Sequence, residues 1–212
     1  GIVHWNGRYW IPVRNLNAAI VTFRAYQPGK GVQALAGLEL QLFGAEYIQL
    51  EARASEPIYI CEGEWDALSL RYMLESDGAP GIVLGAPGAG VWRDVWSEWM
   101  RKRDIVICYD HDDAGKNGAA KVARHFTARQ TLPKAVHWPA EMADGYDIRD
   151  YLRDHDNLDW FFGLVGPLEA PFPVTPENYI PGVSQVGKES NAPDQSKFSD
   201  EDFELPRPDF DE

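Results

Sequence analysis

The chain has 212 residues, of which 44% are hydrophobic and 12% aromatic, so it carries enough apolar side chains for one or two folded domains. No apolar run approaches the roughly 20 residues that a membrane-spanning helix needs, which argues against an integral membrane protein. The formal net charge of −13 at first argues against nucleic acid as a partner, but residues 163–212 carry −8 of it and residues 1–162 only −5. Net charge therefore does not exclude such a partner, because local patches decide it.

The two cysteines, Cys61 and Cys108, each stand near the end of a predicted buried strand. Buried, reduced thiols are the expected state, which indicates a reducing compartment and predicts a cytoplasmic protein. Two cysteines in such positions cannot form a four-cysteine zinc site. The start at Gly1, with neither an initiator methionine nor a signal-peptide pattern, indicates a fragment.

The amino-terminal region predicts two strands over residues 8–14 and 18–25, joined by a polar turn. Pro12 predicts that the first is an edge strand or a short one, because proline cannot donate a sheet hydrogen bond. No acidic residue precedes Glu39, so the cations of this region could line a phosphate-binding face; they are Arg8, Arg14, Arg24 and Lys30. An ordinary solvated surface is the alternative.

A short apolar run over residues 57–61 predicts a buried strand that leads directly into Glu62 and then a helix. Asp66 lies four residues after Glu62, so both carboxylates share a face if the helix starts there. A third strand over residues 81–84 leads to Gly85–Gly90, which either offers backbone amides to an anion or only changes the chain direction. A tryptophan stripe at helical spacing then predicts core packing, at Trp92, Trp96 and Trp99.

The chain is organised around residues 105–115, where an apolar strand ends in an acidic turn. Asp110 and Asp112 are two residues apart, so a near-extended backbone points both carboxylates the same way. Paired carboxylates with no basic residue between them favour a divalent cation, and oxygen ligands suit Mg²⁺ or Mn²⁺ rather than zinc. An Asp-rich turn that caps the helix predicted from Lys116 to Gln130 is the alternative.

Residues 135–138 predict a fourth strand, and the segment after it adds three acids, Asp144, Asp147 and Asp150. Strands that alternate with helices predict a parallel sheet, with two short helices ending the fold near Phe162. Beyond Gly166 the composition turns polar and acidic, which predicts a linker or a docking peptide for a basic partner. Residues 182–189 approach the GxxxxGK[ST] pattern, but Glu189 replaces its hydroxyl residue and no strand precedes it, so we reject a nucleotide-binding loop there.

Residues 60–68, the Asp110-His-Asp112 pair with Ala114-Gly115, and Asp147 resemble the three acidic motifs of the Toprim domain. That domain is shared by DnaG-type bacterial primases, Twinkle-like primase-helicases, topoisomerases and some nucleases. The resemblance implies an α/β fold of Toprim type, with a central, mostly parallel sheet flanked by helices.

The upstream segment resembles the small α+β subdomain that precedes Toprim in DnaG-like primases, on the residues Ile11-Pro-Val-Arg-Asn15, Thr22-Phe-Arg-Ala25, Lys30 and Leu42-Phe-Gly44. Topoisomerases and recombination nucleases do not carry this prefix. We therefore expect a small basic subdomain over residues 1–55, a Toprim catalytic domain over 56–165 and an acidic tail over 166–212. The 212 residues hold neither the family's zinc-binding module nor a helicase domain.

One stretch departs from the family pattern. Many Twinkle-like members have Lys-Asp-x-Asn-Asp where this sequence has Tyr146-Asp-Ile-Arg-Asp150. The first aspartate of the pattern is retained, while its lysine and asparagine are not.

The resemblance implies a DNA primase core that synthesises RNA primers by nucleotidyl transfer with paired Mg²⁺ or Mn²⁺ ions. Asp110 and Asp112 would be the main metal ligands with Asp147 helping, Glu62 a ligand or general base, and Asp66 would orient the site. We expect the oxygens of residues 62, 110 and 112 to meet around a shared ion. The expected nucleotide and template contacts are Arg14, Arg24 and Lys30, with Lys121 and Arg124 as further candidates that could equally be a plain solvated helix face.

The implied partners are single-stranded DNA template and ribonucleoside triphosphates in a bacterial or phage-infected cell. A replicative helicase or a single-strand-binding protein is the candidate protein partner. Two alternatives stay open from the sequence. One is a Toprim-type nuclease that uses the same metals to hydrolyse a phosphodiester, and the other is a non-catalytic replisome scaffold that retains the fold.

Overall fold

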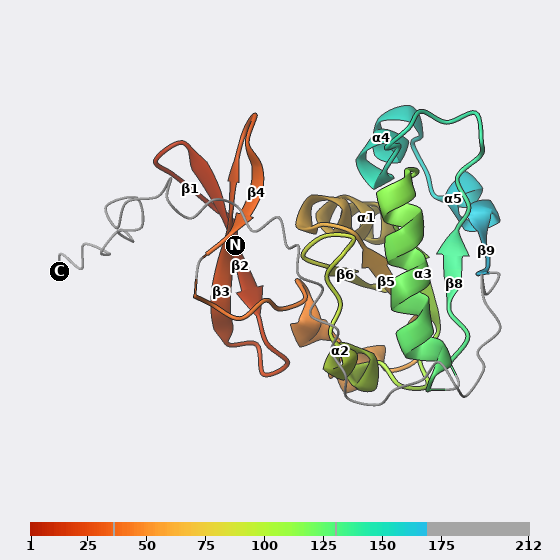
Figure 1. The fold of residues 1–212 in the computed structure, drawn as a ribbon, viewed down its shortest axis with the longest axis horizontal. Helices are drawn as coiled ribbons and strands as arrows, with labels where there is room; N and C mark the ends of the chain where they lie inside the picture. The colour runs from red at the N-terminus through yellow and green to blue at the C-terminus, as the bar shows by residue number, and fades with distance from the viewer. Residues whose placement is uncertain (36, 130, 169–212) are drawn as a thin grey trace. The chain divides into compact units, whose positions relative to one another are not determined.

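The computed structural model describes residues 1–35, 37–129 and 131–168, so residues 169–212 of the predicted tail, with the GxxxxGK-like segment, lie outside it. The described residues belong to one compact unit that contains two sheets (Figure 1). In this part of the chain, no helix has the length and apolar character that crossing a bilayer requires.

The first sheet is antiparallel, with strands in the order β1-β2-β3-β4. They are β1 (Val3–Trp5), β2 (Arg8–Arg14), β3 (Ile20–Gln27) and β4 (Gly31–Ala34). The two predicted strands are confirmed as β2 and β3, whereas β1 and β4 are not predicted. Asn6 and Gly7 turn between β1 and β2 with φ of 50° and 69°, the conformation that an Asn-Gly hairpin favours, so the sequence does hold a signal for β1.

The prediction that Pro12 marks an edge strand or a short one is wrong, because β2 has seven residues and lies between β1 and β3. The physical reason is local. Pairing with β1 ends at Trp10, so Pro12 lies beyond that neighbour and pairs only with Phe23 of β3. The missing N–H therefore costs no hydrogen bond to β1.

The second sheet has the order β6-β5-β7-β8-β9 and is parallel apart from β9. Its strands are β5 (Ile58–Cys61), β6 (Ile82–Gly85), β7 (Ile105–Cys108), β8 (Lys134–Val136) and β9 (Val165–Pro167). Every residue of β5, β6 and β7 is buried, as expected for parallel strands covered on both faces. The predicted mostly parallel sheet is confirmed, while β9 is an unpredicted addition beyond Phe162.

Helices cover both faces of this sheet (Figure 1). On one face, α2 (Asp94–Trp99) and α3 (Asp113–Thr127) bury Trp96 and Phe126 against alternate strand residues. On the other face lie α1 (Glu64–Ser76), α4 (Ile148–Asp154) and α5 (Asp159–Leu164). The predicted core role of the tryptophans is confirmed for Trp92 and Trp96, while Trp99 is partly buried against the same core. Two 3-10 turns, η1 (Ala45–Tyr47) and η2 (Glu51–Arg53), precede β5.

The chain crosses from β5 to β6 on one side and then to β7 on the other. The carboxyl ends of β5 and β7 therefore form a topological switch point, where ligand sites of open α/β sheets occur. Cys61 pairs with Cys108 in register, so the residues after both strands leave the sheet at the same edge. Both thiols are buried and free, as predicted.

Candidate active site

Glu62 follows β5 and lies near backbone groups of two other segments. The backbone amides of Ala89 and Asp110 act on its carboxylate and lower its pKa. Its Oε2 atom is buried and has no hydrogen-bond partner among the described residues. Burial, followed by the charge of Asp112, raises the pKa of Glu62. The side chain thus lies near two amides and keeps a buried oxygen without a partner among the described residues.

The glycine-rich segment after β6 helps to position Glu62. Gly88 N–H donates to the Glu62 carbonyl oxygen at 3.1 Å, and the neighbouring Ala89 amide acts on the Glu62 carboxylate. Helix α3 packs directly on this segment, because a Cβ atom at Gly118 would lie 2.6 Å from the Ala89 carbonyl oxygen. The glycine-rich segment thus contacts both Glu62 and α3.

Asp110 and Asp112 follow β7 and differ in what they contact. Asp112 is the N-cap of α3 and accepts a hydrogen bond from the Gly115 amide at 2.6 Å, so the capping interpretation is confirmed for this residue. Asp110 precedes the cap and is half-buried. The capping role occupies one Asp112 oxygen.

Asp147 is the N-cap of α4, and Arg149 lies in the first turn of that helix. The Asp147 carboxylate accepts from the amides of Arg149 and Asp150, at 2.7 and 2.9 Å, in a capping box. The Arg149 guanidinium pairs with Asp147 and places Nε 2.8 Å from Oδ1 of Asp66. Asp66 and Asp147 are each 6% exposed, so this arginine joins two buried carboxylates.

Five carboxylates from separate segments interact here; this acidic cluster is Glu62, Asp66, Asp110, Asp112 and Asp147. Burial and the charges of the other four members raise the pKa of Asp110 to about 8. Burial also raises the pKa of Asp66 to about 7, even though Arg149 opposes the shift. The chain holds these acids together against their repulsion, which is the condition for binding an external cation.

The donor chemistry of the acidic cluster fits a hard divalent cation. Its donors are carboxylate oxygens, and the unpartnered Oε2 of Glu62 is the kind of buried acceptor that an ion satisfies. In residues 1–35, 37–129 and 131–168, however, no three His, Cys, Asp or Glu side chains are arranged to hold one ion. The expected meeting of residues 62, 110 and 112 around a shared ion is therefore absent from this conformation, in which an Asp112 oxygen caps α3.

A family model described as Toprim-like matches residues 59–152, the segment that supplies the whole acidic cluster. We refer to residues 59–152, which are similar to this family, as the Toprim-like domain. The uncharacterized protein MG010 of Mycoplasma genitalium is 30% identical over 95 residues, which are 43% of this chain and 40% of that protein.

Solved primase structures share the fold of the Toprim-like domain. The zinc-binding and RNA polymerase domains of Aquifex aeolicus primase match with a TM-score of 0.58 and 19% identity over 76% of this chain and 41% of that chain. A DnaG catalytic domain bound to single-stranded DNA gives 0.59 and 16%, over 78% and 56%. The primase fragment of the bacteriophage T7 primase-helicase gives 0.55 and 18%, over 73% and 63%. This chain thus spans 40% of the Mycoplasma relative and 41–63% of these solved chains.

Arg24 connects the first sheet to the Toprim-like domain instead of facing solvent. Its Nε donates to Oε1 of Glu64 at 2.8 Å, and a second nitrogen donates to the carbonyl of Gln41 at 3.3 Å. The Arg24 and Glu64 side chains are only 3% and 4% exposed. The expectation that Arg24 contacts phosphate is at odds with this burial, because its charge is already paired. Burial instead points to a structural role.

Arg24→Met is expected to destabilise the protein by about 3–5 kcal/mol, because it leaves the Glu64 carboxylate buried and unpaired. Chemical denaturation of the single variant measures this cost. The double variant Arg24→Met/Glu64→Leu is the matched control and should recover most of the stability, since it removes both charges. A single variant within about 0.5 kcal/mol of wild type would contradict the pairing.

The other two predicted amino-terminal cations lie at a strand end and in a turn. Arg14 ends β2 and donates to the carbonyl oxygen of Ala18 at 2.8 Å. Lys30 is exposed in the turn between β3 and β4. Both remain candidates for phosphate contact, because neither is paired with a carboxylate in the described residues.

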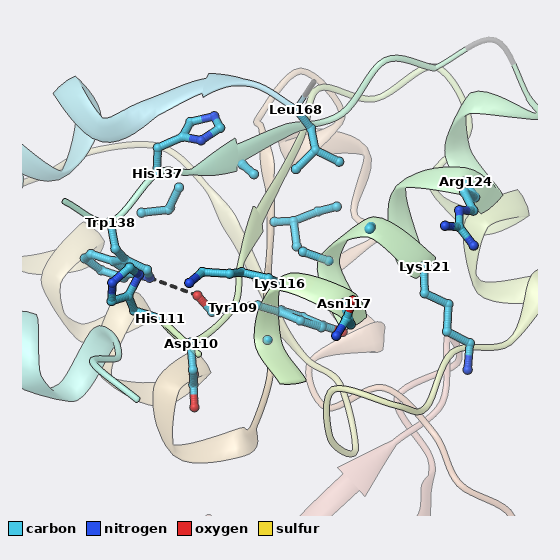
Figure 2. A pocket seen from close by; sticks show the side chains of 16 residues that line it. Tyr109, Asp110, His111, Lys116, Asn117, Lys121, Arg124, His137, Trp138 and Leu168 are labelled. Atoms are coloured by element: carbon cyan, nitrogen blue, oxygen red, sulfur yellow. Dashed lines mark hydrogen bonds between the residues drawn. The ribbon is translucent and has the colours of Figure 1, made fainter. Parts of the chain in front are cut away.

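A cavity of about 830 Å³ lies between α3 and the ends of β7 and β8, with Asp110 on its rim (Figure 2). The Trp138 indole closes one end by donating to the Tyr109 carbonyl oxygen at 2.9 Å. Basic or titratable side chains line the wall; they are His111, Lys116, Lys121, Arg124 and His137. We call this cavity the α3 groove. It brings the predicted pair Lys121 and Arg124 to the same concave surface as Asp110.

Sequence reasoning missed Lys116 and Arg149. Lys116 could have been found from its spacing to Arg124. The two residues are eight positions apart, so they lie on the same face of a helix. The pairing of Arg149 had no comparable signal, since Asp66 is 83 positions away in the sequence. Lys121 donates to the Gly90 carbonyl at 2.6 Å, which links the α3 groove to the glycine-rich segment.

Proposed function

We propose that this chain is the RNA-polymerising core of a DNA primase. What carries the proposal is the acidic cluster at the switch point of a fold shared with primase catalytic cores. Polymerisation joins a 3′-hydroxyl to the α-phosphate of a ribonucleoside triphosphate and releases pyrophosphate. Both the attacking oxygen and the leaving group gain negative charge, so the reaction needs cations held beside them.

Mg²⁺ or Mn²⁺ bound at the acidic cluster would neutralise the triphosphate and favour ionisation of the 3′-hydroxyl. Asp110 and Asp112 would be the main ligands of the ion, with Asp147 in a supporting position. Glu62 has one oxygen without a donor, so Oε2 is the atom that would take the hydroxyl proton or join the ligand set. Asp66, fixed by Arg149, would orient the site.

The α3 groove is our proposed path for a nucleic-acid strand. Lys116, Lys121 and Arg124 come from α3, and Asp110 belongs to the same lining, so a phosphate backbone bound there would lie near the reacting groups. One of the solved DnaG domains holds single-stranded DNA, which supports this class of partner for the fold. Arg14 and Lys30 stay candidates for contacts to template or triphosphate.

Single-stranded template, labelled ribonucleotides and Mg²⁺ test the proposed activity. Primers of a few nucleotides are expected, and neither Glu62→Ala nor Asp110→Ala should make them. Shortened template without primers would instead identify a metal-dependent nuclease. Neither product, together with normal replication in cells that carry both substitutions, would identify a non-catalytic scaffold.

Lys116→Gln/Lys121→Gln is expected to weaken binding of single-stranded DNA and to flatten its dependence on salt. Each lost phosphate contact should reduce the slope of log K against log salt by about 0.7. Fluorescence anisotropy over a salt series measures the slope. Arg101→Gln is the control, because Arg101 is exposed in the turn before β7, at the opposite ends of the strands. Equal slopes for wild type and the double variant would remove the α3 groove from the nucleic-acid path.

A further inference from the structure

A row of aromatic side chains crosses the first sheet and ends on helix α1. In the sheet register, Tyr9 of β2 lies opposite both His4 of β1 and Tyr26 of β3, so the three side chains share one face. The ring centroid of Tyr9 is 4.7 Å from that of His4 and 6.2 Å from that of Tyr26. Trp65 of α1 meets Tyr9 and Tyr26 edge-on, with centroids 6.3 and 5.1 Å away. We call these four residues the aromatic row.

The aromatic row lies outside the hydrophobic core. Tyr9 is 38% exposed and His4 is also exposed, while Tyr26 and Trp65 are half-buried. Within the described residues, the two core clusters contain neither tyrosine, and Trp65 packs only against the outside of one of them. An edge-to-face contact favours one ring orientation, so Trp65 and Tyr26 orient Tyr9. Tyr9 is thus held by its neighbours and still accessible from solvent.

The sheet that carries the aromatic row has cations but no carboxylate. Its strands span residues 3–34, and the first acidic residue of the chain is Glu39. Arg8 precedes Tyr9 in β2, and Lys30 lies in the turn that links β3 to β4. Single-stranded nucleic acid is bound by this combination, because its bases stack on aromatic rings and its phosphates attract cations. The composition of the sheet therefore favours a single strand as the partner of the aromatic row.

The aromatic row ends beside the acidic cluster. Trp65 lies between Glu64 and Asp66 in the first turn of α1, and Asp66 belongs to the acidic cluster. The buried pair of Glu64 with Arg24 also ties this turn to the first sheet. Asp110, another member of the acidic cluster, lines the α3 groove. The acidic cluster therefore connects the aromatic row to the α3 groove.

We propose that the aromatic row is a stacking platform for an unpaired base of the single-stranded template, and that the base contacts Tyr9. Tyr26 and Trp65 are positioning residues that hold the Tyr9 ring. The inference rests on the proposed function, because it names where the template strand of that reaction is held by its bases. Every base has a flat face that can stack, so the platform binds a strand without selecting its sequence.

Fluorescence anisotropy with two labelled oligonucleotides tests this contact. One is an oligothymidylate, and the other has the same length and backbone but abasic sites throughout. Wild type is expected to bind the oligothymidylate about tenfold more tightly, a difference that one stacked base can supply. Tyr9→Leu keeps an apolar side chain without a flat ring, so it should lose about tenfold on oligothymidylate and stay within about twofold of wild type on the abasic strand. Tyr9→Phe keeps the ring and should bind both strands as wild type does.

Phe162→Leu is the matched control for the loss of an exposed ring. Phe162 is 39% exposed on α5, which precedes edge strand β9 of the second sheet, and its substitution should change neither affinity. A salt series gives a second reading. The loss in Tyr9→Leu should be the same at every salt concentration, because stacking releases no counterions. Thermal unfolding verifies that each variant is folded, and the comparison of the two oligonucleotides on wild type stands even if Tyr9→Leu unfolds.

The inference would be overturned by equal affinities of wild type for the two strands, by an unchanged affinity of Tyr9→Leu for oligothymidylate, or by an equal loss on both strands. A loss confined to ribonucleoside triphosphate binding would also overturn it, because the platform would then serve the incoming nucleotide. Primer synthesis on the same preparations keeps these failures separate from failure of the proposed function. Primers made by a wild type that is indifferent to the bases would sink only the role of the aromatic row. Base-dependent binding through Tyr9 without primers would leave the inference standing and end the polymerase proposal.

Discussion

Asp110→Asn is expected to abolish primer synthesis and, at the same time, to raise the melting temperature of the metal-free protein. The two effects have one cause. Asp110 is held among four other carboxylates, and their charges together with burial raise its pKa to about 8. In the metal-free protein, repulsion between the carboxylates lowers the stability of the fold. Removing one negative charge reduces this repulsion, but it also removes a ligand that the site needs for its cation. We expect activity to fall at least about a hundredfold, the usual loss when a charge-stabilising group is removed from an active site.

The stability gain of Asp110→Asn should depend on pH in a defined direction. The folded-state pKa of Asp110 is about 8, above the ordinary value of 3.8, so the folded protein binds one more proton than the unfolded chain between these values. Wild-type stability therefore falls as pH rises through this window and is lowest above the folded-state pKa. The gain from asparagine should be largest at about pH 8.5 and vanish near pH 4.

Thermal unfolding in chelator at both ends of this range measures the effect. Asp110 is partly exposed, so solvent screening limits the gain to about 1 kcal/mol, which corresponds to roughly 2–4 °C for a chain of this size. Asp113→Asn is the control, because Asp113 is exposed in the first turn of α3 and stabilises that helix terminus. It should keep activity and gain no stability. A melting temperature for Asp110→Asn below that of wild type in chelator would contradict the electrostatic account.

The central sheet could be predicted from the sequence because its strands are continuous apolar runs with chemistry at their carboxyl ends. The runs before Glu62 and Asp110 are both fully buried in the structure. The edge strand β9 could not be predicted in this way, since Val165-Gly-Pro167 contains two residues that disfavour strands. It forms because it pairs with β8, a contact that exists only in three dimensions.

The order of the predicted strands was enough to predict that the acidic residues lie close together. It was not enough to predict which residues form ion pairs with Arg24 and Arg149. The sequence predicts an unpaired cation at Arg24 because no acidic residue lies near it in the sequence. Its partner in the structure, Glu64, lies 40 positions later. Whether an arginine faces solvent or a buried carboxylate depends on packing between elements, which local patterns do not encode. The same limit hid the contact between Arg149 and Asp66.

Gly115→Ala is expected to lower the free energy of unfolding by about 2–4 kcal/mol and to abolish primer synthesis, although alanine is the better helix former. A Cβ atom at position 115 would lie 2.2 Å from the carbonyl oxygen of Asp110, and 3.0 Å from its backbone nitrogen and carbon. The Gly115 amide also donates to the capping oxygen of Asp112. Relief of this clash must move α3 away from the strand end, so the backbone of Asp110 and the cap at Asp112 are both displaced.

Gly163→Ala separates this clash from the general effect of replacing a helical glycine. Gly163 lies in α5, and a Cβ atom there would meet nothing within 4 Å. Alanine at 163 should leave activity intact and stabilise by up to about 1 kcal/mol. Urea unfolding should therefore show that Gly115→Ala lowers and Gly163→Ala raises the free energy of unfolding, although both replace glycine with alanine. Primer synthesis should be lost in Gly115→Ala alone. Equal stability of the two variants would mean that α3 does not pack against the backbone of Asp110. Close packing of α3 would then not explain the positions of Asp110 and Asp112.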